Sequence, residues 1–529
     1  DKARVIILDT IAKSSGSGCA DEWYYVQHGG LKGYLCGTYV IVEVMSVEEF
    51  EGDFPDSYKP ALAILQARYP NWEFIPINTG LDFNEAALRQ SKDHRYGTAL
   101  ISTINEGWRS VSAYSGYDWE KDYWPGMDGD TWKAANKDVV EYYMDPRNFL
   151  DESNIFQFEE LLYNPYIDEN DVNYALRNTF MTNYDKYTGT YRYNGIDKTY
   201  SSTFIEAAQK HQVNPIFIVT RVRQEVVLSG GHPSSSVSGT VKGYEGYYNF
   251  FNIGAYAGRV AGVNDPVING LMYAKDRGWN NPYKSITEGV SGNLIDVYIK
   301  RGAQTRYFQK FNVNPARWNY YSVHEMQYMT NVQAPYSEGR AAYSAYKNRG
   351  KLSSDSSFRF LIPVFNNMPQ STKLPHKGNP NLYLKDLRVN GKTIDGFAYD
   401  KANYKVSVPL SANSINIDGS TINSKASISG SGNVLLTAQD NNLNVVVTAE
   451  NGNKFTYKIN VVKEDVQNIP IETILDNSGI KYNDKHISGI KVGTNVSSLI
   501  NNVKKTSSFA SIQIFDVEGK SKTNAAFKT

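Results

Sequence analysis

The chain has 529 residues, of which 41% are hydrophobic, and its length predicts about three or four folded domains. Lys+Arg and Asp+Glu both number 55, so the formal net charge is zero; this argues against a nucleic-acid-binding protein, which normally carries a basic excess, and gives no electrostatic attraction to an anionic membrane. No run of residues approaches the roughly 20 apolar positions of a membrane helix, and no signal peptide is visible, so the start at Asp1 suggests a trimmed or mature form.

The first 48 residues contain short β segments and both cysteines, Cys19 and Cys36. The stretch between them, ADEWYYVQHGGLKGYL, has the pattern of two strands joined by a Gly-Gly turn, and two cysteines that flank a hairpin can reach disulfide distance. A disulfide would fit an oxidising, extracellular setting; the alternative is two free thiols in a small core. The whole pattern resembles a bacterial SH3-like wall-binding domain, so residues 1–48 are predicted to form a partial module of this kind.

Residues 49–110 are predicted to be an α/β segment that leads into the next domain. FPDSYKPALAILQARYP indicates a helix that Tyr69 and Pro70 end, and WEFIPIN indicates a strand.

The chain then becomes helical and aromatic. DESNIFQFEELLYNP predicts a helix with Ser153 as its N-cap. TFIEAAQKHQ predicts a second helix that starts at a capping box of Thr203 and Glu206. Asn214 is predicted to cap a third helix, with Pro215 at its first position.

A Pro-rich linker, NNMPQSTKLPHKGNP, separates the helical part from the C-terminal part. After it, period-two alternation broken by Asn-Gly turns predicts strands. Residues 381–463 resemble the cadherin-like β-sandwich repeat of Firmicute surface proteins. Residues 464–529, with HISGIKVGTNVSSLI and ASIQIFDVEGKSKTN, are predicted to be a C-terminal β module.

Glu225 is the main candidate for chemistry. It lies on the third helix at i+7 from Ile218 and i+3 from Val222, so its carboxylate falls on an apolar stripe. A carboxyl group in apolar surroundings can act near neutral pH as the general acid that protonates the leaving oxygen of a glycoside. The alternative is an ordinary exposed pair with Arg221 at i−4, worth only about 0.3–0.5 kcal/mol.

The aromatic stretch GYEGYYNFFNIGAY is predicted to be a β-hairpin. One strand face would carry Tyr247, Asn249 and Phe251, and the other would carry Tyr248 and Phe250. Such a hairpin is costly to expose unless it lines a cleft, and the alternative is a small hydrophobic core beneath the helix. The 39 tyrosines suit stacking on sugars, although this composition is also typical of secreted proteins from AT-rich genomes.

The sequence contains no recognisable metal or nucleophile motif. No two of the seven histidines are spaced i, i+4 or lie in HExxH, and there is no GxSxG. His211 and His232 flank Glu225, which leaves a zinc amidase as a formal alternative.

Several motifs follow one another in a specific order: RQE, GGHPSSSVSG, GYEGYYNFFNIGAY, NGLMYAKDRGWNNPYKSI, YIKRGAQTRYFQKFNV and HEMQYMTNVQAP. In this order they resemble the bacterial cell-wall endo-β-N-acetylglucosaminidases of glycoside hydrolase family 73, autolysin-like enzymes of Firmicutes. The resemblance implies a multidomain protein in which residues 111–370 form a lysozyme-like α+β, mainly helical, catalytic domain flanked by small all-β modules. It also implies hydrolysis of the β-1,4 bond between N-acetylglucosamine and N-acetylmuramic acid in peptidoglycan, with no metal and no organic cofactor.

By the same resemblance, Glu225 is the general acid. The residues assigned to substrate binding are Tyr247, Tyr248, Asn249, Phe251 and Gln224. Relatives do not agree on a second catalytic carboxylate, and a route assisted by the substrate's 2-acetamido group is one possibility. Glu245 is preferred over Asp265 as the second catalytic group, because it lies at the entrance of the predicted hairpin; the alternative for Glu245 is a solvent-facing turn residue.

Two further functional alternatives stay open. One is a muramidase or lytic transglycosylase that acts on the same glycan strand, and the other is a catalytically weak wall-binding surface protein. The predicted partners are peptidoglycan glycan strands and, through the β modules, the cell-wall surface, with no nucleic acid and no membrane span. The predicted location is secreted, at the cell wall.

Overall fold

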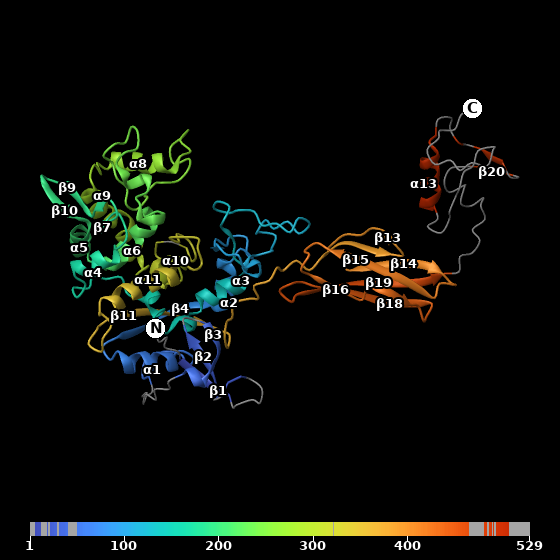
Figure 1. Ribbon diagram of the computed structural model, residues 1–529, viewed down its shortest axis with the longest axis horizontal. Coiled ribbons are helices and arrows are strands. Elements are labelled where there is room, and N and C mark those ends of the chain that lie inside the picture. Colours follow the sequence, from blue (N-terminus) through green and yellow to red (C-terminus); the bar gives the residue numbers. More distant parts are fainter. Residues whose placement is uncertain are drawn as a thin grey trace. The chain divides into compact units, whose positions relative to one another are not determined.

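Figure 1 shows the computed structural model of the chain. The structure describes residues 6–11, 18–19, 22–28, 31–40, 50–320, 322–464, 481–483, 486–488, 490 and 494–506. The chain divides into a larger unit, Asp1–Asp118 with Tyr123–Lys377, and a smaller unit, Trp119–Asp122 with Gly378–Thr529. The chain is therefore multidomain, as expected. No helix in the described ranges is long and apolar enough to cross a membrane.

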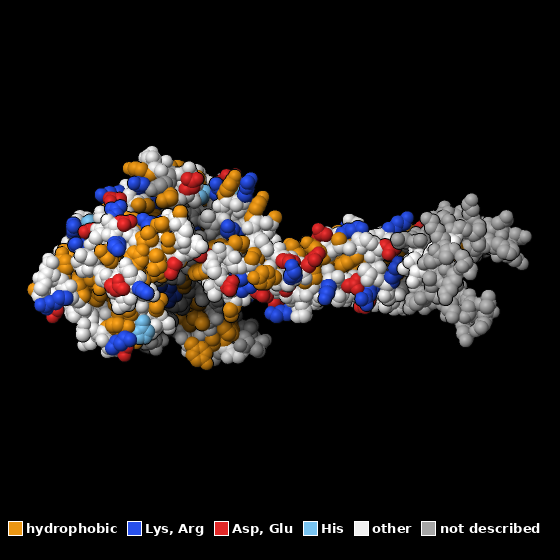
Figure 2. Space-filling model, turned by 90° about the horizontal axis from the view of Figure 1, so that it is seen from above, with side chains coloured by type: hydrophobic (Ala, Val, Ile, Leu, Met, Phe, Trp, Pro, Cys, Tyr) orange, Lys and Arg blue, Asp and Glu red, His pale blue; other side chains and the backbone are white. Residues whose placement is uncertain are grey.

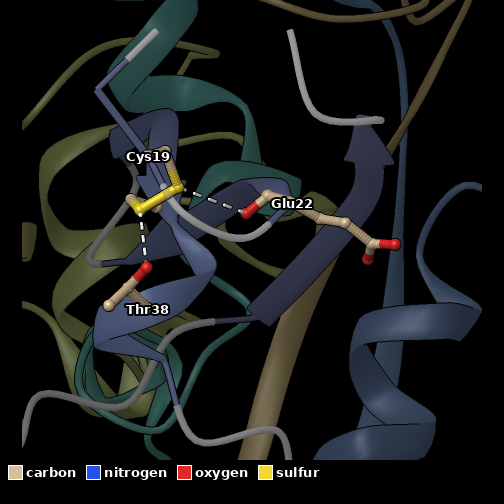
Figure 3. The surroundings of a disulfide bond; sticks show 4 residues. Cys19, Glu22 and Thr38 are labelled. Atoms are coloured by element: carbon tan, nitrogen blue, oxygen red, sulfur yellow. Dashed lines mark hydrogen bonds between the residues drawn. A yellow bond between two sulfur atoms is a disulfide. The ribbon is translucent and has the colours of Figure 1, made fainter. Parts of the chain in front are cut away.

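The larger unit begins with an antiparallel sheet of β1 (Ile6–Ile11), β2 (Trp23–His28) and β3 (Leu31–Cys36), in that order. A disulfide joins Cys19 to Cys36 across a sequence separation of 17 residues, which confirms the predicted bridge (Figure 3). A closed loop of this length stabilises the folded state by about 3 kcal/mol, through the entropy that it removes from the unfolded chain. The bridge ties the chain ahead of β2 to the end of β3, and the single turn η1 (Gly37–Tyr39) follows.

The ends of the larger unit's helical part meet in a parallel strand pair. Helix α1 (Lys59–Arg68) and strand β4 (Glu73–Asp82) form where the sequence predicts them, and β4 pairs with β11 (Arg359–Asn366). The aromatic side chains around this pair, from Trp72 to Phe360, stack and cross edge to face in the core. Residues 49–110 are thus joined by backbone hydrogen bonds to a segment almost 300 residues further along the chain.

The remaining elements of the larger unit are mostly short. The α-helices are α2 (Phe83–Gln90), α3 (Lys137–Met144), α4 (Glu169–Ala175), α5 (Tyr200–His211), α6 (Pro215–Val226), α7 (Ser235–Ser238), α8 (Pro266–Asp276), α9 (Pro282–Gly289), α10 (Arg306–Lys310) and α11 (Ala334–Asn348). The short strands are β5 (Leu100–Ile101), β6 (Lys133–Ala134), β7 (Asn183–Tyr184), β8 (Tyr187–Thr188), β9 (Thr190–Tyr193) and β10 (Ile196–Thr199). The 3₁₀-helical turns are η2 (Glu106–Trp108), η3 (Pro146–Phe149), η4 (Ile155–Phe158), η5 (Ser229–Gly231), η7 (Ile299–Arg301) and η8 (Pro315–Arg317). The element η6 (Val290–Ile295) is a π-helix. Helix α6 packs against α4, α5 and α11 (Figure 1).

The predicted helix with Ser153 as its cap is wrong. Only the turn η4 forms, and Asn154 rather than Ser153 precedes it. The backbone that follows bonds to distant segments instead of to itself, because Glu160 N donates to Arg359 O and Leu161 N donates to Gln304 O. Tertiary pairing therefore overrides the helical spacing of the apolar residues.

The start of α5 also differs from the prediction. The helix begins at Tyr200, and Thr199 caps it by accepting a hydrogen bond from Ser202 N at 3.1 Å. Thr203 therefore lies inside the helix, where its hydroxyl donates to Thr199 O at 2.9 Å. The predicted capping box of Thr203 and Glu206 is wrong by about one turn.

The predicted aromatic hairpin at residues 244–256 is also wrong, because the segment forms a series of turns without strands. Gly246, Asn252 and Gly254 all have left-handed backbone, with φ of 74°, 48° and 73°. Three left-handed residues within nine positions break the regular extended backbone that a strand of the predicted hairpin needs. Phe250 and Phe251 are both buried although they are neighbours, so part of the stretch belongs to the hydrophobic core, as in the alternative interpretation.

The smaller unit is a β-sandwich. One sheet has the order β13-β12-β15-β17 and the other β14-β19-β18-β16. The strands are β12 (Leu384–Val389), β13 (Lys392–Thr393), β14 (Asn403–Pro409), β15 (Ser414–Thr421), β16 (Ser427–Ser429), β17 (Gly432–Leu435), β18 (Asp440–Thr448) and β19 (Lys454–Glu464). Asn390 and Gly391 join β12 to β13 with φ of 51° and 80°, the positive pair that an Asn-Gly hairpin turn requires. The predicted strands are confirmed here.

The described part of the C-terminal segment is not purely β. It contains β20 (Lys481–Asn483), β21 (His486–Ser488) and the helix α13 (Val496–Thr506). The helix replaces part of a predicted strand because Asn495 caps it, its side chain accepting from Ser497 N at 2.8 Å, and because Val496 and Leu499 recur at helical spacing and are buried. ASIQIFDVEGKSKTN lies outside the described residues.

Candidate active site

Helix α6 presents Glu225 at its last turn. The predicted cap is confirmed: Asn214 Oδ1 accepts from Ile216 N at 2.9 Å and from Phe217 N at 3.1 Å, and Pro215 takes the first helical position. Ile218 and Val222 are fully buried, and Glu225 one turn further is half-buried. The carboxylate therefore stands where an apolar stripe reaches the surface, as the sequence predicts.

Two neutral side chains hold the carboxylate of Glu225. The hydroxyl of Tyr328 donates a hydrogen bond to Oε1. Asn252 Nδ2 lies 3.2 Å from Oε2 and 2.8 Å from the main-chain oxygen of the same residue. Because Asn252 bonds both to the backbone and to the carboxylate, it fixes the side-chain rotamer of Glu225. Within the described ranges, no lysine, arginine or histidine forms a salt bridge with Glu225.

Arg221 does not make the surface pair with Glu225 that the alternative interpretation supposed. It is only 1% exposed, and its Nη2 lies 2.7 Å from Gln309 Oε1 and 3.4 Å from Glu338 Oε2. Its guanidinium carbon lies 3.2 Å from the centroid of the Tyr328 ring, a close cation–π contact. Arg221 thus supports the residue that bonds Glu225, from the buried side.

The hydroxyl of Tyr328 keeps its proton. Burial raises the pKa of Tyr328 well above its usual value, and the negative charges of Glu225 and Glu338 add to this, whereas Arg221 opposes it. When Glu225 is in its carboxylate form, the protonated phenol beside it can only donate, so the direction of this hydrogen bond follows from chemistry.

The predicted substrate-binding residues divide into two groups. Tyr247 and Tyr248 are half-buried, and Gln224 is exposed, with Nε2 3.6 Å from Met329 Sδ. Asn249 and Phe251 are buried. The amide of Asn249 is occupied inside the loop, because Nδ2 donates to Ile253 O and Gly270 O at 2.9 Å each. The binding roles of all five residues stay predictions.

The two candidates for a second catalytic carboxylate have local partners. Glu245 is exposed, and Gly243 N donates to it at 3.0 Å; backbone hydrogen bonds, its own amide first, lower its pKa. Asp265 caps α8, accepting from Val267 N at 2.8 Å. In the described structure no hydrogen bond joins either carboxylate to Glu225, so the catalytic role of Glu245 also stays a prediction.

The two histidines that flank Glu225 in the sequence, His211 and His232, have other hydrogen-bond partners. His211 Nε2 lies 2.8 Å from Thr287 O, and His232 Nδ1 lies 3.0 Å from Tyr187 Oη. The described residues contain no group of three or more His, Cys, Asp or Glu side chains that could hold a metal ion.

Tyr328 and Asn252 were not singled out from the sequence. They lie 103 and 27 residues from Glu225, respectively. Both fall inside quoted motifs, HEMQYMTNVQAP and GYEGYYNFFNIGAY, but neither carries a charge or a spacing that indicates contact with Glu225. The only signal was their membership of these motifs.

Parts of this chain are similar in sequence to known proteins. A family model described as a cadherin-like β-sandwich domain matches residues 384–464. The bifunctional autolysin of Staphylococcus epidermidis is 26% identical over 197 residues, which cover 36% of this chain and 13% of that protein. The β-N-acetylglucosaminidase of Bacillus subtilis (strain 168) is 26% identical over 216 residues, which cover 41% of this chain and 21% of that protein. This chain thus spans less than a quarter of the length of either relative.

Part of the chain also matches solved structures. One is the structure of the Major Bifunctional Autolysin, with 22% identity and a TM-score of 0.34, covering 55% of this chain and 98% of that one. Another is that of S. aureus glucosaminidase B, with 19% identity and a TM-score of 0.35, covering 57% of this chain and 97% of that one. The sequence matches confirm the resemblance predicted from the motifs: part of this chain is similar to bacterial proteins named bifunctional autolysin and β-N-acetylglucosaminidase, and residues 384–464 match the cadherin-like β-sandwich model.

Proposed function

We propose that this chain is a secreted peptidoglycan hydrolase that cleaves the β-1,4 bond between N-acetylglucosamine and N-acetylmuramic acid and leaves glucosamine at the new reducing end. The observation that carries the proposal is the half-buried Glu225, held by Tyr328 and Asn252 at the end of an apolar helix stripe. The names of the sequence relatives support the substrate class. Residues 111–370, together with the segment that supplies β4, would form a lysozyme-like catalytic domain.

In this proposal Glu225 is the general acid. Its protonated carboxyl group gives its proton to the glycosidic oxygen as the bond to the sugar's anomeric carbon breaks. The carboxylate that remains accepts hydrogen bonds from Tyr328 and Asn252, and a hydrogen bond to a charged group contributes about 1.5–3 kcal/mol. These donors therefore stabilise the charge that develops on Glu225 as the leaving group departs.

The 2-acetamido group assists this bond cleavage: its oxygen bonds to the anomeric carbon as the leaving oxygen departs, which forms a bicyclic oxazolinium ion. In the second step water attacks the anomeric carbon and opens this ring, and the carboxylate of Glu225 takes the proton of the water. The local contacts of Glu245 and Asp265, a turn and a helix cap, favour this route over a second enzyme carboxylate. The competing route uses Glu245 as that carboxylate.

Aromatic side chains and the β modules supply binding. Tyr247 and Tyr248 would stack on sugar rings beside Glu225, with Gln224 at the same edge, while Asn249 and Phe251 hold the loop. Hydrophobic side chains are spread over the visible surface of the larger unit (Figure 2), and the exposed large hydrophobic side chains of this unit include Tyr96, Tyr114 and Tyr256. The N-terminal sheet, with its disulfide, and the cadherin-like sandwich would hold the protein at the cell wall, and the disulfide fits an extracellular location.

The test is mass spectrometry of borohydride-reduced muropeptides from purified peptidoglycan, with Glu225→Gln run alongside. Reduced N-acetylglucosaminitol ends that vanish in the variant would support both the bond and the acid. Muramitol or anhydro-muramic ends would instead indicate a muramidase or a lytic transglycosylase. No new ends would favour the wall-binding alternative.

A further inference from the structure

Tyr328 lies in the loop between η8 and α11, and the described residues of this loop have no regular secondary structure to fix their conformation. Both His324 and Met326 have left-handed backbone, with φ of 69° and 49°. For residues other than glycine this conformation costs roughly 1–3 kcal/mol each and persists only where the surroundings impose it. The orientation of Tyr328 against Glu225 therefore depends on contacts from outside the loop. These include the backbone bond from Tyr328 N to Gln309 O at 2.9 Å, the bonds from Asn312 Nδ2 to Ser322 O and Glu325 O, and further side chains.

Gln90 is such a side chain, and it comes from a distant part of the chain. It is the last residue of α2, is 1% exposed, and lies 237 positions from Gln327. Its Nε2 lies 2.7 Å from His324 Nδ1, and its Oε1 accepts a hydrogen bond from Gln327 Nε2. A single amide thus bonds to the loop at both positions, four and one residues before Tyr328.

These hydrogen bonds belong to a chain that runs in series from Lys310 to His324, and each donor lies on the Lys310 side of its bond. Lys310 Nζ donates to Gln327 Oε1 at 3.1 Å, Gln327 Nε2 donates to Gln90 Oε1, and Gln90 Nε2 donates to His324 Nδ1. Each amide uses its oxygen on the side of Lys310 and its nitrogen on the side of His324. Since an amide nitrogen can only donate, His324 Nδ1 accepts, and the ring carries its proton on Nε2.

The charges around His324 agree with a neutral ring. Burial first, then the nearby Arg89 and His94, lower the pKa of His324 to about 4. An imidazolium would carry a proton on Nδ1 and would face the amide nitrogen of Gln90 donor against donor. The neutral ring is the form that completes the chain.

We infer that Gln90 is a positioning residue for the reaction: its amide sets the loop at His324 and Gln327, and thereby sets the hydroxyl of Tyr328 against Glu225. The inference rests on the proposed function, because it assigns Gln90 a part in turnover by Glu225. Gln90 itself touches neither Glu225 nor Tyr328 through any hydrogen bond of the described structure. A displacement of about 1 Å at a reacting group can lower turnover about 100-fold.

The experiment compares Gln90→Leu, which keeps the size of the side chain but removes both hydrogen bonds, with Gln157→Leu. Gln157 is a matched control because it is also a glutamine 1% exposed in the larger unit, and the hydrogen bond of its amide in the described structure is local, to the oxygen of Asn154, which directly precedes η4. We expect Gln90→Leu to lower kcat on purified peptidoglycan about 10- to 100-fold with KM changed less than about twofold. Gln157→Leu should keep kcat within about twofold even where it lowers the unfolding midpoint as much. Equal losses of kcat in both variants would overturn the inference.

The role of Tyr328 is tested by a double-mutant cycle. Once Tyr328→Phe has removed the hydroxyl, adding Gln90→Leu should lower kcat by less than about a further twofold. If the two losses multiply, Gln90 does not act through Tyr328. Where Gln90→Leu does not fold, Gln327→Met breaks the same chain from the loop side, and the same cycle is run with it.

The same cycle is read by urea unfolding, which does not depend on activity. If the two residues are coupled, the double variant should change the unfolding equilibrium constant by clearly less than the product of the changes in the two single variants. A double-variant change equal to that product would overturn the inference. A wild-type protein without turnover on peptidoglycan would refute the proposed function, while a coupled unfolding cycle would still support the link between Gln90 and Tyr328.

Discussion

Arg221 lies over the ring of Tyr328, with its guanidinium carbon 3.2 Å from the ring centroid, and the hydroxyl of that tyrosine donates a hydrogen bond to Glu225. A buried cation and the candidate acid are thus linked through a neutral phenol instead of a direct ion pair. The arrangement fixes the carboxyl group without a direct ion pair between Arg221 and Glu225 in the described structure.

The hydroxyl of Tyr328 should contribute to turnover. Tyr328→Phe keeps the ring on Arg221 but removes the donor to Glu225, and loss of one such donor to a developing charge costs about 100-fold or more in kcat. Tyr336→Phe is the matched control, since its hydroxyl accepts from Arg340 at 2.9 Å on the surface of α11. Steady-state rates on purified peptidoglycan check this, and an unchanged kcat in Tyr328→Phe would contradict the role of Tyr328.

Arg221 should matter to stability as well as to the site. Arg221→Met leaves Glu338, itself 6% exposed, without its buried cation. Breaking a buried ion pair from one side costs about 3–5 kcal/mol. Urea unfolding measures this loss of stability, and the activity of the protein reports the unfolding of the larger unit. Arg221→Met combined with Glu338→Leu should recover part of it, because no unpaired charge then remains; a double variant less stable than the single one would count against this explanation.

Stability should rise with pH above neutrality because of Lys310. Burial lowers the pKa of Lys310 from 10.5 to about 7. Between pH 7 and 10.5 the unfolded state therefore binds a proton that the folded state does not. Stability increases with pH across this window, and at and below about pH 7 the contribution is absent. The full effect is roughly 5 kcal/mol.

The measurement is the free energy of unfolding from pH 6 to 10 for wild type and for Lys310→Met, taken as a difference so that other titrating groups cancel. Lys310→Met should flatten the rise with pH. Parallel profiles in the two proteins would show that Lys310 does not carry it.

Local signals and tertiary contacts account for what the sequence could and could not predict. The cap of α6 was predictable because Asn214 and Pro215 act on the turn next to them. The hairpin at 244–256 was not, because its aromatic alternation hid three left-handed residues that only the folded loop reveals. Glu225 could be found from its stripe, whereas Tyr328 could not, since a contact across 103 residues leaves no periodic trace.

Two measurements separate a substrate-assisted route from a route that uses Glu245 as the second catalytic carboxylate. If the 2-acetamido oxygen attacks the anomeric carbon, glycan strands with deacetylated glucosamine lack the attacking group and should resist cleavage. Glu245→Gln should then retain most of its kcat, because Glu245 is exposed and bonds only to its own turn in the described structure. Rates on native and chemically deacetylated peptidoglycan, each measured with wild type and with Glu245→Gln, decide between the routes. Cleavage of deacetylated strands together with a large loss in Glu245→Gln would assign the second role to Glu245, since an enzyme carboxylate needs no help from the acetamido group.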